Sequence, residues 1–162
     1  LKGLKLGAVE ACHTERVRLN PGARELVATM KAHGARAVLV SGGFGYFTSR
    51  VAKMAGFDAD RANTLIDDGV ALTGAVAMPI LGREAKLTAL LEETAALGLT
   101  ADDAVALGDG ANDLDMIKAA GLGIAYQAKP IVAAQTTARI QHTDLRAALL
   151  FQGYAVSDFV SA

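Results

Sequence analysis

Three times along the chain, a short apolar run ends in a loop of small or polar residues and a helical pattern follows. The apolar runs cover residues 37–40, 104–107 and 123–126. Uninterrupted apolar runs of this length are typical of strands that are buried on both faces, as in a parallel sheet. The repeated order of strand, loop and helix therefore predicts an α/β fold, with helices on both faces of a parallel sheet.

The segments between these units predict further helices and one hairpin. Asn20 as a helix cap and Pro21 at the first helical position predict a helix over residues 21–33. A second helix is predicted to end at Gly98. The Asp-Asp-Gly sequence at 67–69 predicts the turn of a small β-hairpin. The first ~15 residues and the tail from residue 144 onward are predicted to add helices.

The composition is compatible with a folded domain and excludes several classes of protein. The chain has 162 residues, of which 52% are hydrophobic, and this is enough for one domain with a core. The net charge of −1 gives no basic excess for a nucleic-acid partner, and no apolar stretch is long enough to span a membrane. Cys12 is the single cysteine, so no internal disulfide forms, and we expect a cytoplasmic protein.

Residues with chemical potential follow the predicted strands, at the edge where open α/β sheets bind ligands. Ser41, Gly42 and Gly43 offer a hydroxyl and backbone N–H groups that suit a phosphate. A plain glycine turn with Ser41 as a helix cap is the alternative. Lys86 lies one turn into a predicted helix, where a cation is unfavourable by roughly 0.3–1 kcal/mol unless an anion is nearby. A solvated lysine is the alternative there.

The sequence GDGANDLDM at 108–116 places several acids directly after an apolar strand. One helix cap explains one acid, but it does not explain Asp109, Asn112 and Asp113 together. A hard cation such as Mg²⁺ uses one or two carboxylates, completed by waters and phosphate oxygens. We therefore expect a metal at the acid pair, with Asn112 donating to a phosphate oxygen or to substrate. Asp115 is expected to face solvent.

Other interpretations of this loop fail on spacing. An EF-hand that starts at Asp109 would need an oxygen ligand where Ala111 stands and glycine where Leu114 stands. A dinucleotide-binding loop that starts at Gly108 would direct Asp113 at the pyrophosphate. The phosphate cradle, the lysine and the acid pair together indicate phosphoryl transfer by positioning and electrostatics.

Three stretches resemble a known family: LVSGGF, GREAK and GDGANDLDMIKAAGLGIAYQAKP. They are similar to motifs of the phosphoserine phosphatases of the haloacid dehalogenase (HAD) superfamily, and the match runs to about residue 154. The resemblance implies a HAD-like, Rossmannoid sheet with a cap and a Mg²⁺ ion. It also implies hydrolysis of L-phosphoserine to L-serine and phosphate through an aspartyl-phosphate intermediate, as part of serine biosynthesis.

The same resemblance implies roles for six residues. Ser41 and the Gly42 amide would bind the transferring phosphoryl group, and Lys86 would neutralise it. The loop would supply Asp109 as the Mg²⁺ ligand, Asn112 as a substrate contact and Asp113 as the support of the metal shell. The hairpin at 67–69 would be a flap beside the site.

One part of the family's pattern does not occur. The nucleophile of the family lies in an Asp-x-Asp-x-Thr/Ser motif on the central strand, and residues 58–62 copy its spacing only. We therefore expect residues 1–18 to be a remnant of the helical cap and residues 19–162 an incomplete core. The central catalytic strand and most of the cap would be absent, so we expect this chain alone to be inactive.

The missing strand has structural consequences. The strands of Val38 and Val105 would flank it, so their free backbone groups need another partner. They are expected to pair with each other, with an N-terminal fragment or with a second copy of the chain. Two other functions stay open, namely a HAD phosphatase for another small phosphomonoester and a non-catalytic phosphate-binding module.

Overall fold

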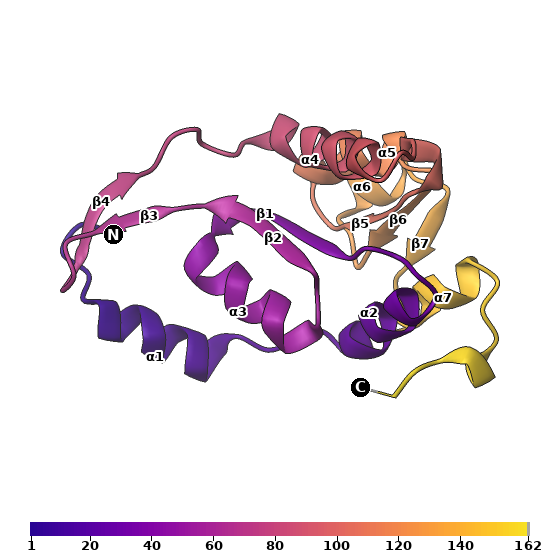
Figure 1. Ribbon diagram of the computed structural model, residues 1–162, viewed down its shortest axis with the longest axis horizontal. Helices are drawn as coiled ribbons and strands as arrows, with labels where there is room; N and C mark the ends of the chain where they lie inside the picture. The colour runs from indigo at the N-terminus through magenta and orange to yellow at the C-terminus, as the bar shows by residue number, and fades with distance from the viewer. Residues whose placement is uncertain (162) are drawn as a thin grey trace.

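The computed structural model describes residues 1–161, and helices and strands alternate along most of that length (Figure 1). The α-helices are α1 (Leu6–Arg16), α2 (Ala23–Ala32), α3 (Gly45–Ala55), α4 (Arg83–Ala96), α5 (Leu114–Ala119), α6 (Pro130–Ala133) and α7 (Ala147–Phe151). The strands are β1 (Val38–Phe44), β2 (Ala59–Asn63), β3 (Leu65–Asp67), β4 (Leu72–Val76), β5 (Val105–Gly108), β6 (Leu122–Tyr126) and β7 (Ala138–Ile140). Short 3₁₀ turns are η1 (Ala101–Asp103), η2 (Ala111–Asp113) and η3 (Val156–Asp158).

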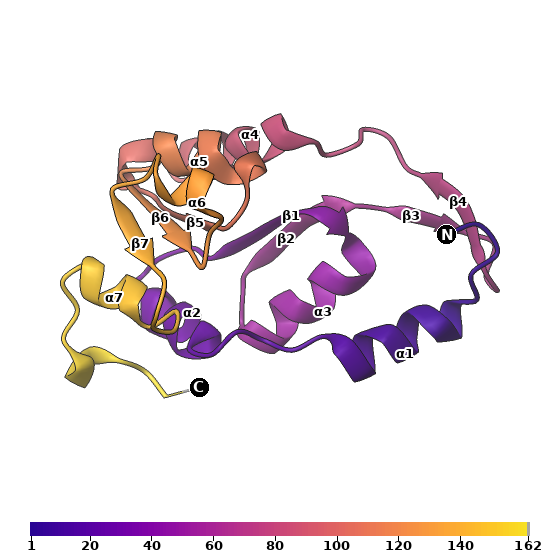
Figure 2. The ribbon, with the colours of Figure 1, turned by 180° about the vertical axis from the view of Figure 1, so that it is seen from behind.

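The strands form three separate sheets. β1 pairs in parallel with β2, and β5, β6 and β7 form a parallel sheet in that order. β3 and β4 form the predicted antiparallel hairpin, whose turn contains Asp68 and Gly69. Helices α4, α5 and α6 lie on one side of the parallel strands, and α2 and α3 lie on the other (Figures 1 and 2). The predicted α/β fold with a hairpin flap is therefore confirmed.

The most completely buried residues lie around β6 and β7. Ile124, Ile140 and Ala148 have no more than 2% of their surface exposed and form one cluster with Tyr126. Such burial of β6 on both faces requires helices on each side of it, as the apolar run predicted. Within residues 1–161, no helix combines the length and the apolar composition that a membrane crossing requires.

The two parallel sheets remain apart. In residues 1–161, β1 pairs only with β2, and β5 pairs only with β6. Of the three partners expected for the Val38 and Val105 strands, direct pairing with each other is therefore wrong. Each of the two strands keeps one edge of backbone N–H and C=O groups outside any ladder, which is the usual template for an added strand.

Helix α4 connects the two parallel sheets through an ion-pair network. Arg61 on β2 donates to Glu93 on α4 at 2.7 Å and also contacts Glu92. Arg36, just before β1, donates to the other oxygen of Glu93 at 2.7 Å. The arginine-rich side of the β1–β2 unit is thus fixed to a helix that packs on α5.

Two predicted boundaries differ from the structure. The helix expected over residues 21–33 begins two residues later, because Gly22 takes a left-handed conformation (φ 79°) and closes a turn with Asn20 and Ala23. β1 runs through the Ser-Gly-Gly segment to Phe44, so α3 begins at Gly45 and not directly after Gly43.

Strands β2 and β7 were missed from the sequence. The β2 sequence ADRAN is too polar for a buried strand, but its charges are paired. Thr48 donates to Asp60 at 2.5 Å, and Arg61 binds the glutamates of α4. β7 has only three residues, which is too short for a periodic pattern.

The N-terminal segment contacts the flap through an isolated antiparallel bridge between Lys5 and Ala71. The N–H of Gly3 donates to the carbonyl of Leu72 at 2.8 Å, and the N–H of Leu72 donates to the carbonyl of Leu4 at 2.8 Å. Helix α1 then follows, with Val9 buried. The assignment of residues 1–18 to a cap stays a prediction.

The ion-pair network generates a prediction on acid stability. Hydrogen bonds from Arg36 and then Arg61 hold the pKa of Glu93 below its ordinary value of 4.5. A carboxylate whose pKa is lower in the folded than in the unfolded state stabilises the fold fully at pH values above the unfolded-state pKa. This contribution is lost as the pH falls through the folded-state pKa. Glu93→Gln should lower the free energy of unfolding by about 1 kcal/mol at pH 7.

Urea unfolding at a series of pH values measures this effect. The difference in the free energy of unfolding between wild type and Glu93→Gln should shrink as the pH falls below 4.5. Glu15→Gln, on the exposed face of α1, is the control and should change little at any pH. A difference that stays constant with pH would contradict this account of the network.

Candidate active site

The Ser-Gly-Gly segment leaves the β1–β2 ladder. The register runs from Val40 opposite Arg61 directly to Phe44 opposite Asn63, so β1 has two residues more than β2 in this interval. Such a bulge directs backbone groups out of the sheet. The hydroxyl oxygen of Ser41 accepts a hydrogen bond from the N–H of Gly43 at 3.0 Å, which leaves the hydroxyl proton for another acceptor.

Lys86 and Asp113 form a buried ion pair. Only 13% of the Lys86 side chain and 3% of the Asp113 side chain are exposed, and Nζ donates to Oδ1. The other carboxylate oxygen of Asp113 accepts from the N–H groups of Asp109 and Gly110 at 3.0 and 2.9 Å. Both oxygens are therefore occupied, and Asp113 holds the loop and the lysine in place.

Two glycines allow this close packing. A Cβ at Gly108 would lie 2.4 Å from the Cβ of Asp113, which is far inside contact distance. A Cβ at Gly110 would lie 2.3 Å from Oδ1 of Asn112. The Asn112 side chain thus folds back against Gly110, on the exposed side of the 3₁₀ turn η2.

The loop fits a metal ion in part. Asp109 is exposed at the end of β5, and its side chain has no hydrogen bond or ion pair in the described structure. Residues 1–161 contain no group of three or more acidic, histidine or cysteine side chains that could hold a metal ion. Asp109 can offer one carboxylate, and Mg²⁺ in proteins often takes only one or two.

Asp115 was expected to face solvent, but its carboxylate is paired with Arg83. It accepts two hydrogen bonds of 2.8 Å from Arg83, and 39% of its side chain is exposed. Arg83 keeps the pKa of Asp115 below its usual value. This pair lies beside the loop and joins the first turn of α4 to α5.

The residue that connects the two halves of the site was not predicted from the sequence. Asn63, at the end of β2, is 5% exposed, and its amide nitrogen donates to the carbonyl of Gly42 at 2.9 Å. Its amide oxygen accepts from the N–H of Leu81 at 2.7 Å, shortly before α4 and Lys86. In the described structure, no direct bond joins Ser41 or Gly42 to Lys86, Asp109 or Asp113. An asparagine in a polar, unrecognised strand gave no signal for this position.

Asp58 and Asp60 have structural partners. Asp58 pairs with Lys31 at 2.8 Å and accepts from the N–H of Ala37 at 2.8 Å, and these contacts lower its pKa. Asp60 accepts from Thr48. Asp58 also precedes β2, whereas the candidate site lies at the opposite, carboxyl ends of the strands. Neither acid is placed to act on a ligand there.

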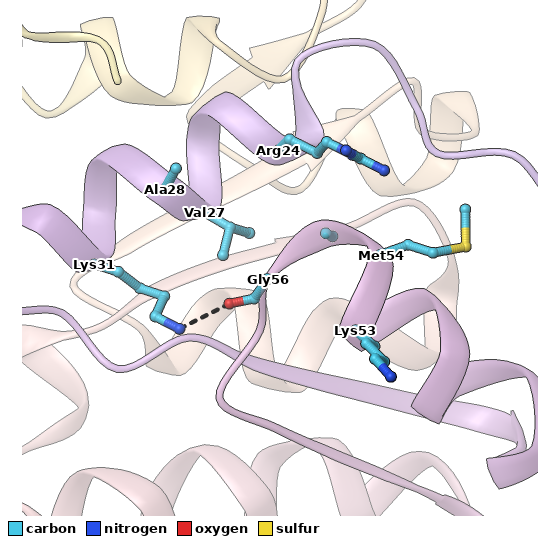
Figure 3. Close-up of a pocket in the computed structure, with 8 residues that line it drawn as sticks. Arg24, Val27, Ala28, Lys31, Lys53, Met54 and Gly56 are labelled. Atoms are coloured by element: carbon cyan, nitrogen blue, oxygen red, sulfur yellow. Dashed lines mark hydrogen bonds between the residues drawn. The ribbon is translucent and has the colours of Figure 1, made fainter. Parts of the chain in front are cut away.

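A cavity of about 300 Å³ lies elsewhere, between α2 and the carboxyl end of α3 (Figure 3). Lys31 points across it and donates to the carbonyl of Gly56 at 2.8 Å. Arg24 and Lys53 lie at its rim. Because Lys31 already serves Gly56 and Asp58, this cavity has less to offer a ligand than the strand ends.

Comparison with known proteins places the chain in a family. Residues 1–118 match the model of the haloacid dehalogenase-like hydrolases. The chain belongs to this family. It is 46% identical over 147 residues to a phosphoserine phosphatase of Streptomyces coelicolor, covering 89% of this chain and 35% of that protein. It is 42% identical over 149 residues to a phosphoserine phosphatase of Polaromonas sp., covering 90% of this chain and 63% of that protein.

A solved structure of a phospho-aspartyl intermediate analogue of phosphoserine phosphatase has the same fold. It superimposes with a TM-score of 0.85 at 38% identity, over 93% of this chain and 72% of that chain. The chain thus spans between about one third and three quarters of the length of each of these relatives. The fold and the family are shown, and the roles of individual site residues remain predictions.

The buried pair should respond asymmetrically to substitution. Asp113→Ala leaves an uncompensated ammonium and two unpaired N–H groups, so it should cost about 3–5 kcal/mol of stability. Lys86→Ala leaves a carboxylate that still accepts two N–H groups and should cost less, about 1–3 kcal/mol. Asp115→Ala, which breaks only the exposed pair with Arg83, is the control and should change the stability least. The urea midpoint of unfolding measures each variant. A midpoint lowered as much by Lys86→Ala as by Asp113→Ala would contradict the predicted asymmetry.

The close packing of Gly108 gives a second stability prediction. Gly108→Ala should destabilise the fold by about 1–3 kcal/mol, because its Cβ must displace Asp113. Gly7→Ala, in helix α1 with no atom near the added Cβ, should be neutral or stabilising by up to about 1 kcal/mol. Thermal unfolding of both variants provides the comparison, and an unchanged midpoint for Gly108→Ala would be the contrary result.

Proposed function

We propose that this chain supplies the phosphate-binding part of a phosphomonoesterase site whose substrate is L-phosphoserine and whose products are L-serine and phosphate. The observation that carries the proposal is the buried pair of Lys86 with Asp113 in the loop after β5, together with the Ser-Gly-Gly bulge at the carboxyl end of β1. A buried lysine beside a bulge rich in N–H groups suits a phosphate dianion. The names of the relatives supply the substrate.

The residues divide the work by chemistry. The hydroxyl of Ser41 and the N–H of Gly42 donate to phosphoryl oxygens, and the ammonium of Lys86 offsets their charge. Asn112 lies on the exposed side of the loop, where its amide can contact substrate. Asp113 orients Lys86 and the backbone of the loop. All five residues act by holding charge and position, which is the main protein contribution to phosphoryl transfer.

The nucleophile comes from outside the described residues in this proposal. The free edges of β1 and β5 favour a strand inserted between them, which brings an aspartate to the centre of the site and forms the aspartyl-phosphate. An N-terminal segment or a second copy of the chain supplies that strand, and the chain alone is inactive. The relative solved as a phospho-aspartyl intermediate analogue supports this chemistry.

The exposed carboxylate of Asp109 fits one ligand position of Mg²⁺, and we propose that ion as the cofactor. When bound, it would offset negative charge on the phosphoryl group. We place the enzyme in the cytoplasm, in serine biosynthesis, which agrees with a single free cysteine at Cys12.

Phosphate release from L-phosphoserine tests the proposal, with a protein in which this chain is extended to include an Asp-x-Asp-x-Thr/Ser strand. Lys86→Ala and Asp109→Asn should each lower kcat by about 10²–10³. Asp115→Asn, in the first turn of α5 directly after the loop and paired with Arg83, should retain most of the activity. Retained activity in both site variants would exclude the proposed roles.

Two alternatives are separated by the same assay. Faster turnover of another compound in a panel of small phosphomonoesters would reassign the substrate. The lack of an Asp-x-Asp-x-Thr/Ser motif in the given sequence favours, as a second candidate, a non-catalytic phosphate-binding module. That module predicts phosphate binding without turnover even in the extended protein.

A further inference from the structure

We infer that Asn63 is a positioning residue for the phosphate site, because its one buried side chain fixes both segments that approach the phosphate. This inference rests on the proposed function, since it deepens the description of the same site. Asn63 is 5% exposed at the carboxyl end of β2. It makes no contact with the proposed ligand and acts through the backbone of β1 and of the segment before α4.

The bulge in β1 makes this side chain necessary. Between Val40 and Phe44, the chain has no register partner on β2, so the carbonyl of Gly42 has lost its place in the ladder. The amide nitrogen of Asn63 donates to that carbonyl at 2.9 Å. A side chain therefore replaces the missing backbone partner.

The peptide group between Gly42 and Gly43 is held at both its carbonyl and its N–H. The carbonyl of Gly42 and the N–H of Gly43 belong to one planar peptide unit. Asn63 binds the carbonyl at 2.9 Å, and the oxygen of Ser41 accepts from the N–H at 3.0 Å. The peptide that adjoins the N–H of Gly42 is thus fixed, and the Ser41 oxygen is held in place while its hydroxyl proton stays available to an anion.

The same side chain also fixes the approach to Lys86. The Asn63 oxygen accepts from the N–H of Leu81 at 2.7 Å, and its nitrogen donates a second bond to the carbonyl of Leu81 at 3.3 Å. Leu81 lies two residues before α4, whose second turn carries Lys86. Asn63 thus pairs with Leu81 as a strand would.

Both polar atoms of the Asn63 side chain have partners in these contacts. An asparagine amide has two N–H donors and one carbonyl oxygen, and each has a backbone partner on one of the two segments. A buried amide that serves only as a space filler would not require partners from both. The geometry is that of a fixed spacer between the Ser-Gly-Gly bulge and the start of α4.

Binding of inorganic phosphate by the 162-residue chain tests this inference. Amide chemical shifts of ¹⁵N-labelled protein give both the dissociation constant and the residues involved. Asn63→Leu should weaken phosphate binding at least tenfold and shift the free-state signals of Gly42, Gly43 and Leu81. Asn63→Ser keeps one donor and one acceptor and leaves room for water, so it should weaken phosphate binding less than Asn63→Leu. It provides the test if Asn63→Leu does not fold.

Thr29→Val is the matched control. Thr29 is fully buried and its hydroxyl accepts from the N–H of Val160 at 2.9 Å, away from the strand ends. This variant should lose stability but bind phosphate within twofold of wild type. Wild-type affinity in Asn63→Ser, together with wild-type binding in the control, would overturn the inference on Asn63 but not the proposed phosphate site. Wild-type protein that binds no phosphate would overturn the proposed phosphate site as well.

Discussion

The ion pair between Lys86 and Asp113 is the interaction on which the candidate site depends. A charged pair with so little exposure is tolerated only when its hydrogen-bonding groups are satisfied. Asp113 meets this condition with two backbone N–H groups of its own loop, and the glycines at 108 and 110 let those groups approach. The loop is therefore shaped around one carboxylate, and Lys86 is held where the proposed phosphate would lie.

A second constraint acts on the sheet. The parallel strands form two units joined by α4 and its ion pairs, and not by strand pairing. The site nevertheless draws on both units, since the Ser-Gly-Gly bulge belongs to one and the acidic loop to the other. The side chain of Asn63 bridges them through hydrogen bonds to the backbone of Gly42 and of Leu81, in the segment before α4. The distance between the two halves of the site is thus set without a central strand.

The sequence predicted those parts of the fold in which the local pattern agrees with the tertiary environment. The apolar strands predicted at 37–40, 104–107 and 123–126 and the hairpin turn belong to this group. β2 was missed because Asp60 and Arg61 are compensated only by residues far along the chain, on α3 and α4. The residues of the acidic loop could be proposed from spacing, whereas Asn63 could not, because its role arises from a bulge that no local pattern indicates.

The central claim is that phosphate binds at the strand ends between the Ser-Gly-Gly bulge and Lys86. Mapping amide shifts of the 162-residue chain during titration with phosphate and Mg²⁺ tests it most directly. Saturable shifts are expected at Ser41, Gly42, Gly110 and Asn112. Shifts confined to the cavity between α2 and α3, around Lys31 and Lys53, would contradict it, and so would no saturable shift at the strand ends.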